Sequence, residues 1–133
     1  MDERKFDLED RLIDFSALVI EVVDTLPSNR VGNHIAGQLL RSGTAAAPAY
    51  GEAQGAESRR DFIHKLKIGL KELRETRVWL KLLKRKLITQ PAEVIERTLA
   101  ECEELTAIFA SSITTAKKNL GKAGRNIQIT NTE

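Results

Sequence analysis

The chain is poor in the residues that build disulfide-stapled or sheet-rich domains. Its 133 residues include one cysteine, three prolines, eight glycines, one tryptophan, one tyrosine and four phenylalanines. The lone Cys102 cannot form a disulfide within the chain, which excludes a stapled scaffold and fits a reducing compartment. Scarce proline and glycine, beside abundant Ala, Leu, Glu, Lys and Arg, favour helices. We therefore expect one all-α domain.

Long apolar runs are also missing. A membrane-spanning helix needs roughly 20 apolar residues in succession, and even the apolar stretch of residues 15–26 is interrupted by Glu21 and Asp24. The first ten residues are acidic, whereas a secretory signal peptide has a basic start and an apolar centre. The sequence predicts a cytoplasmic protein without a membrane partner.

Motifs that bind metals or cofactors, or that catalyse reactions, are absent as well. Di-iron bundles use paired Glu and Glu-x-x-His motifs. Here only Asp61 and His64 approach that spacing, and His34 has no acidic residue at helical spacing. Cys102 falls on a predicted apolar face without a neighbouring histidine, which indicates a buried small residue rather than a nucleophile. We expect no catalytic residue, metal or cofactor.

Apolar residues recur at alternating spacings of four and three, the pattern of helices packed in a bundle. The predicted helices span about residues 8–25, 30–55, 59–88 and 91–118. The second should be kinked near residues 42–48, where Gly43 and Pro48 disturb a helix. Ser58 and Asp61 form a variant of the capping box at the start of the third.

Short connections between these helices predict an antiparallel, up-down-up-down four-helix bundle over residues 1–118. Residues 119–133 contain two glycines and few large apolar side chains. We therefore expect a mobile C-terminal tail there. Its Ile127 and Ile129 could still dock on a partner subunit.

The small net charge of +2 conceals a segregation of charge along the chain. Residues 1–26 hold eight acidic residues against three basic ones, a net charge of −5. Residues 58–88 hold eleven basic residues against three acidic ones, a net charge of +8. The third predicted helix is therefore the place to look for a charged partner.

Five basic residues of that helix fall on neighbouring turns and could contact successive phosphates of RNA or DNA. They are Lys67, Lys71, Arg74, Lys81 and Arg85. The plainer interpretation, which holds for most runs of charge, makes them a solvated face that pairs with the acidic helices, and places Glu75 in an ion pair with Lys71. Few aromatic residues accompany them, so base stacking has little support.

Three further residues suggest a polar network rather than a catalytic pair. Tyr50, Glu52 and Glu72 lie beside small or apolar positions, where a carboxylate needs hydrogen-bonding partners such as Arg41 or Arg74. A general acid-base pair is the alternative, but no nucleophile or metal ligand accompanies it. We expect a structural network that fixes the register of the helices.

Residues 38–87 contain motifs that resemble a known bacterial family. These are Arg41-Ser42, Ala49-Tyr50-Gly51-Glu52-Ala53, Asp61-Phe62-Ile63, Glu72, Glu75-Thr76 and Trp79-Leu80. In order and spacing they resemble the four helix bundle proteins, which include the intervening-sequence protein of large-subunit ribosomal RNA and, distantly, the accessory protein of diversity-generating retroelements. The resemblance implies a left-handed bundle, a homopentamer and no enzyme activity. Within such an assembly Trp79 would lie at a subunit interface.

Charge pattern and resemblance together predict a non-enzymatic oligomeric binding or scaffold protein that contacts RNA or DNA through its basic third helix. The alternative is an adaptor for a protein partner, without direct contact to nucleic acid. An enzyme that uses Glu52 and Glu72 is the third hypothesis, and a structure that seals these carboxylates from any cleft would exclude it.

Overall fold

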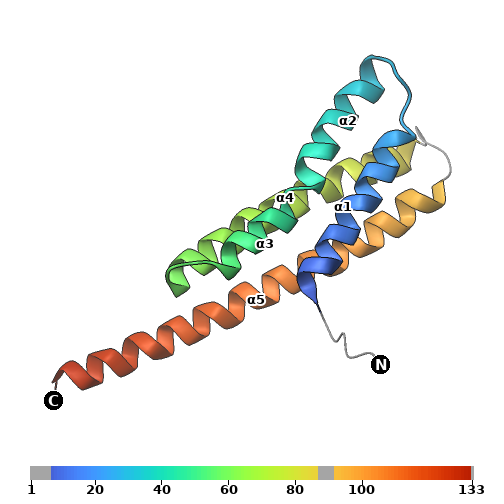
Figure 1. Ribbon diagram of the computed structural model, residues 1–133. Helices are drawn as coiled ribbons and strands as arrows, with labels where there is room; N and C mark the ends of the chain where they lie inside the picture. Colours follow the sequence, from blue (N-terminus) through green and yellow to red (C-terminus); the bar gives the residue numbers. More distant parts are fainter. Residues whose placement is uncertain (1–6, 87–91, 133) are drawn as a thin grey trace.

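The computed structural model describes residues 7–86 and 92–132, and every regular element within these ranges is helical (Figure 1). The helices are α1 (Leu8–Asp24), α2 (Arg30–Gly43), α3 (Ala46–Gln54), α4 (Arg59–Lys86) and α5 (Ala92–Thr132). The prediction of an all-α fold is confirmed. None of these helices is both long enough and apolar enough to cross a membrane.

Two helix starts follow directly from local sequence. The side chain of Asn29 accepts a hydrogen bond from the Gly32 amide at 2.8 Å, which caps α2. At the start of α4 the Ser58 hydroxyl accepts from the Asp61 amide at 3.0 Å, and the Asp61 carboxylate accepts from the Glu57 amide at 3.4 Å. These bonds satisfy amides that a helix leaves without partners at its N-terminus. The predicted capping box is present, except that the Asp61 carboxylate accepts from the Glu57 amide instead of the Ser58 amide.

The second predicted helix is broken in two rather than kinked. Helix α2 ends at Gly43 and α3 begins at Ala46, and Figure 1 shows that the two point in clearly different directions. A Cβ atom at Gly43 would lie 2.6 Å from Cγ1 of Val19, so only glycine lets α1 approach this closely. Pro48 falls in the first turn of α3, where its missing N–H needs no partner. The single helix expected over residues 30–55 is therefore corrected to α2 and α3.

Helix α5 is longer than expected. It continues from Ala92 to Thr132, so the helix end predicted at residue 118 is absent. Glycines 121 and 124 lie inside the helix, where each costs only about 1 kcal/mol relative to alanine. In Figure 1 the C-terminal end of α5 extends past α3 and the start of α4. The side chains of Ile127 and Ile129 lie outside those that the structure describes.

The core lies where α4 packs along α5, with α1 and α3 closing its sides. Its largest fully buried side chains are Phe15, Phe109, Leu12, Leu39, Leu66, Leu73, Leu80, Leu83, Ile95, Leu105, Val19 and Val22. At Gly69 the helices come especially close, because an added Cβ would lie 2.5 Å from the Phe109 ring and 3.4 Å from Cβ of Ala49. A glycine at this position therefore permits the close packing of α4 against its neighbours.

Candidate nucleic-acid interface

The five basic residues predicted to contact phosphates form a single exposed row along α4. This basic stripe consists of Lys67, Lys71, Arg74, Lys81 and Arg85, all exposed. Spacings of three, four and seven residues return to the same helix face, and 1.5 Å per residue gives the row a length of roughly 27 Å. Val78 lies in the middle of the row and is itself 60% exposed. The helix thus presents its charges on one straight, rigid edge.

Acidic residues of the chain neutralise other cations of α4, on either side of the basic stripe. The pairs are Lys65 with Glu52 (3.4 Å), Arg77 with Glu103 (3.2 Å) and Lys84 with Glu96 (3.8 Å). Within residues 7–86 and 92–132, no member of the basic stripe forms an ion pair. Pairing with acidic segments therefore explains the flanks of α4 but leaves the stripe available to an external anion.

The predicted ion pair between Lys71 and Glu75 does not form. Instead the Glu75 carboxylate accepts hydrogen bonds from the Arg41 guanidinium and from the Trp79 indole, the latter at 3.0 Å. The bond from Arg41, followed by that from Trp79, lowers the pKa of Glu75, while Lys71 adds a weaker favourable charge. Arg41 also donates to Glu72 at 3.1 Å. This cluster ties α2 to α4, and Lys71 forms no ion pair within the described chain.

Tyr50 packs rather than participating in a polar network. Its ring lies 6.4 Å from that of Phe109, at an interplanar angle of 54°. Burial, reinforced by the charges of Asp7 and Glu9, raises the pKa of the Tyr50 phenol. Within the described residues its hydroxyl contacts neither predicted carboxylate, so Tyr50 contributes mainly to the core between α3 and α5.

The two carboxylates of the predicted network lie apart and serve different helix pairs. Glu52 is exposed on α3 and pairs with Lys65 of α4. Glu72, whose side chain is only 13% exposed, pairs with Arg41 of α2. The Glu72–Arg41 contact was anticipated, but the joint network of Tyr50, Glu52 and Glu72 was wrong. The two glutamates do not face each other across a shared site, which removes the basis for an acid-base pair.

Trp79 lies at the seam between α2 and α4. Its ring meets that of His34 edge-on, with centroids 5.9 Å apart and planes at 80°. One side packs against the core, and its indole N–H is bound to Glu75. The neighbouring Leu82 is 38% exposed. Trp79 therefore fastens α2 to α4, and its predicted place at a subunit interface stays a prediction.

Two polar contacts between helices were not anticipated. The Arg11 side chain of α1 donates to Glu101 at 2.6 Å and to Glu104 at 2.5 Å, both on α5. The hydrogen bond to Glu101, more than any other interaction, raises the pKa of Arg11 above its ordinary value. Ser42 and Thr76, both fully buried, share a hydrogen bond of 3.0 Å. Arg11 is a basic residue within an acidic helix, and this feature of the sequence could have indicated its contact with α5.

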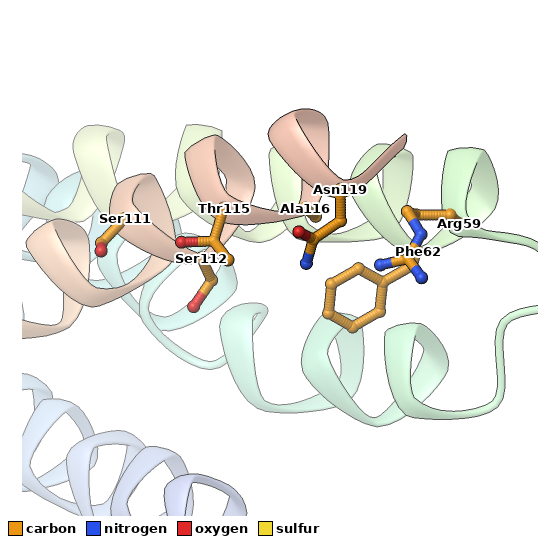
Figure 2. Close-up of a pocket in the computed structure, with 7 residues that line it drawn as sticks. All are labelled: Arg59, Phe62, Ser111, Ser112, Thr115, Ala116 and Asn119. Atoms are coloured by element: carbon orange, nitrogen blue, oxygen red, sulfur yellow. The ribbon is translucent and has the colours of Figure 1, made fainter. Parts of the chain in front are cut away.

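A shallow hollow of about 330 Å³ opens near the start of α4 and the second half of α5 (Figure 2). It is lined by Arg59, Phe62, Ser111, Ser112, Thr115, Ala116 and Asn119. Figure 2 shows the Phe62 ring and the Arg59 guanidinium beside Asn119, with the serines farther along α5. The lining has hydroxyls, one amide and one guanidinium but no carboxylate, imidazole or thiol, so it offers its hydroxyls no general base that would activate them.

A metal site and a reactive thiol are two further kinds of site to consider in the part of the chain that is described. No group of three or more His, Cys, Asp or Glu side chains is placed to hold a metal ion there. Cys102 is fully buried and its thiol donates to the Leu73 carbonyl at 3.3 Å. Burial raises the pKa of this thiol to about 12. Because a thiolate is the reactive form, the buried thiol is inert near neutral pH.

Comparison with known proteins agrees with the resemblance seen in the sequence. The chain is similar to a crystal structure described as a protein with unknown function from the S23 ribosomal protein family of Bacteroides thetaiotaomicron VPI-5482. The two share 34% sequence identity with a TM-score of 0.72, over 80% of this chain and 98% of that one. Among curated proteins, none matches the chain.

The decisive comparison is with a protein family. The sequence profile of the family described as 23S rRNA-intervening sequence protein matches residues 4–111, which include α1 to α4 and the first half of α5. The match covers the basic stripe, the Arg41 cluster and the contact at Gly69. This chain therefore belongs to the 23S rRNA-intervening sequence protein family.

Proposed function

We propose that this protein is a non-enzymatic, oligomeric scaffold of the cytoplasm that binds the phosphate backbone of RNA or DNA through the basic stripe. One observation carries the proposal: five exposed cations form a straight row on α4 without ion pairs in the described chain, while Lys65, Arg77 and Lys84 on the same helix are neutralised. Unpaired cations in a row attract the regularly spaced charges of a phosphate backbone.

In this proposal the helices form an antiparallel, up-down-up-down, left-handed bundle, and five copies assemble into a ring with Trp79 at the interface. The family resemblance supports the ring, and the opposite directions of α4 and α5 support the antiparallel arrangement. That direction follows from the ion pairs, in which Lys84 meets Glu96 and Arg77 meets Glu103. A ring would present five basic stripes and raise the avidity for a long polymer.

Fluorescence anisotropy with labelled RNA and DNA across a salt series tests the binding. The stripe variant Lys71→Gln/Arg74→Gln/Lys81→Gln should bind more than about tenfold more weakly, and the slope of log affinity against log salt should fall by roughly 0.7–0.9 for each lost phosphate contact. The matched control is Lys65→Gln/Arg77→Gln/Lys84→Gln, which removes the same charge from paired positions. Equal losses in both variants, or no binding by the unmodified protein, would refute the proposal.

Sedimentation equilibrium tests the ring. The expected mass is five times the 14.8 kDa of one chain. If Trp79 lies at the interface, its fluorescence maximum should move to longer wavelength as dilution separates the subunits. A monomer at all concentrations would exclude the pentamer, and an unchanged spectrum on dissociation would place the interface elsewhere.

A protein adaptor is the second candidate, favoured by exposed apolar surface within the basic stripe. A hollow of about 460 Å³ is lined by Arg74, Arg77, Val78, Glu103, Thr106, Ala107 and Ala110. Its small side chains and cationic rim fit an acidic amphipathic helix of a partner. Affinity purification from the native host with and without nuclease separates the candidates, because an adaptor keeps its partner after nucleic acid has been digested.

A further inference from the structure

A second group of basic side chains lies beyond the basic stripe, toward the start of α4. Arg60, His64, Lys67 and Lys117 line a shallow hollow of about 270 Å³ between α4 and α5, with Ile63 and Leu120 also in its lining. All four of the basic side chains are exposed. We call Arg60, His64 and Lys117 the end cluster. Lys67 belongs both to this hollow and to the basic stripe, so the two groups are continuous.

Nothing in the described chain neutralises the end cluster. No ion pair involves Arg60, His64 or Lys117 within residues 7–86 and 92–132. The sequence has no acidic residue from position 105 to position 132, and none from position 62 to position 71. Asp61, the acidic residue nearest in sequence, accepts from the Glu57 amide at the helix start. The positive end of the α4 dipole adds to the local potential.

Together the end cluster and the basic stripe form a straight row from residue 60 to residue 85. At 1.5 Å per residue this row is roughly 38 Å long, which slightly exceeds one turn of duplex nucleic acid, about 34–36 Å. Because Arg60, His64 and the basic stripe are all built on α4, this row cannot bend to follow a flexible strand, and Lys117 of α5 lies beside its start. Its shape therefore suits a partner that is itself straight.

The aromatic side chains near the row are already engaged. Trp79 packs against His34 and donates to Glu75, and Phe62 packs against the core beside the separate hollow of Figure 2. Proteins that bind single strands combine a cationic groove with aromatic side chains on which successive bases stack. A row of cations without a stacking platform contacts phosphates alone, and only a duplex keeps its phosphates at regular spacing on a stiff surface.

From this geometry we propose that the nucleic acid is double-stranded, and that the end cluster is a second phosphate-contact region which a duplex reaches while it lies on the basic stripe. The proposal rests on the proposed function, because the stripe must bind first. Arg60 and Lys117 supply charge, and His64 supplies an N–H donor in either protonation state. RNA and DNA duplexes share this phosphate chemistry.

The test measures anisotropy with the full chain and duplexes of about 8 and about 20 base pairs, which at 3.4 Å per base pair are roughly 27 and 68 Å long. Only the longer duplex extends past the basic stripe. Arg60→Gln/Lys117→Gln should weaken binding of the longer duplex by about tenfold and that of the shorter by less than about twofold. RNA and DNA are run as separate arms, each beside a single strand of the same length.

The matched control is Lys84→Gln/Arg97→Gln, which removes the same charge from cations that pair with Glu96 and Glu21. Avidity between copies affects both variants alike, so a loss of affinity that is specific to Arg60→Gln/Lys117→Gln at each duplex length comes from the end cluster. Circular dichroism confirms that both variants are folded. The unmodified protein should prefer either duplex over the single strand by at least about tenfold at equal salt.

The outcomes distinguish the two proposals. Equal or tighter binding of the single strand, or equal loss on both duplex lengths, would overturn the end-cluster proposal while leaving the function of the basic stripe intact. Failure to bind any nucleic acid would defeat the proposed function itself. A preference for RNA or for DNA duplex would identify which helix form supplies the phosphates.

Discussion

The hydroxyls of Ser42 and Thr76 share a hydrogen bond of 3.0 Å at the buried contact of α2 with α4. Thr76 also donates to the Glu72 carbonyl of its own helix at 2.8 Å. Because a threonine hydroxyl carries one proton, Ser42 must supply the proton of the shared bond whenever Thr76 donates to that carbonyl. Both side chains are inaccessible to water, so the Ser42 hydroxyl depends on Thr76 for a hydrogen bond, whereas Thr76 also has the Glu72 carbonyl.

Thr76→Val should lower the free energy of unfolding by about 1–3 kcal/mol, because it leaves the buried Ser42 hydroxyl without this partner. Ser42→Ala should cost less, since Thr76 keeps the Glu72 carbonyl. The double variant should be less destabilised than the sum of the two single variants, because it removes both polar groups. Urea denaturation of the unmodified protein, the two single variants and the double variant measures this coupling. Strict additivity of the free-energy changes would contradict the hydrogen bond between Ser42 and Thr76.

Gly69→Ala should destabilise the protein by about 1–3 kcal/mol, the usual cost of overpacking a core. The added Cβ would lie 2.5 Å from the Phe109 ring, so α4 and α5 would have to separate or Phe109 would have to move. Gly37→Ala is the matched control, because nothing lies within 4 Å of its added Cβ. That change should stabilise the helix by about 0.5–1 kcal/mol. Thermal unfolding of both variants checks the opposite signs.

Trp79 should report the titration of Glu75. The indole donates to the Glu75 carboxylate, and this is the sequence's single tryptophan, so its fluorescence is a clean probe. Arg41 lowers the pKa of Glu75 from its ordinary 4.5. The stabilisation by the carboxylate is therefore present above the ordinary pKa and is lost as pH falls through the lower, folded-state value.

A fluorescence titration should give a midpoint below 4.5, and Arg41→Gln should move that midpoint upward. Far-UV circular dichroism recorded in parallel keeps local titration distinct from acid unfolding. A midpoint at or above the ordinary value in the unmodified protein would mean that Arg41 does not hold Glu75 in solution.

Cys102 should make stability depend on alkaline pH. Burial raises the pKa of its thiol from 9.0 to about 12. In the unfolded chain the thiol ionises as pH rises past its ordinary value, whereas in the folded chain it stays protonated. Stability is thus fully present below the ordinary pKa and is lost as pH rises toward the folded-state value.

Between about pH 8 and about pH 10.5, this thiol should lower the free energy of unfolding by roughly 1–2 kcal/mol, at 1.36 kcal/mol per pKa unit. Cys102→Ala removes that component while retaining the titration of lysines and Tyr50. The difference between the two proteins in urea unfolding, under reducing conditions, isolates the thiol. Parallel pH profiles would show that Cys102 is not protected by burial.

Helix starts and the basic face of α4 could be predicted because they depend on residues close together in sequence. Asn29 and Ser58 cap helices through amides three residues away, and the basic stripe follows from the period of one helix. The break between α2 and α3 was signalled by Gly43 and Pro48, but its form depends on Val19 of another helix. The continuation of α5 past residue 118 was missed because its glycines were read as helix-ending signals.

The partners of charged groups could not be predicted, because they depend on distances between helices. Lys71 was the obvious partner of Glu75 along one helix, yet Arg41 of α2 reaches that carboxylate instead. Tyr50 and Glu52 are two residues apart, which places them about 200° apart around a helix and makes a shared network unfavourable. The angular separation of Tyr50 and Glu52 could be derived from the sequence, whereas the preference of Glu75 for Arg41 over Lys71 could not.

The segregation of charge places strongly acidic and strongly basic segments in one molecule whose net charge is only +2. Acidic α1 lies against the first half of α5, where Arg11 meets Glu101, while the second half of α5 carries no acidic residue before position 133. A cation-exchange column and an anion-exchange column should each retain the protein at low salt, because each binds the surface segments of opposite charge. The orientation of the protein relative to a charged surface, rather than its net charge, then governs how it first approaches that surface.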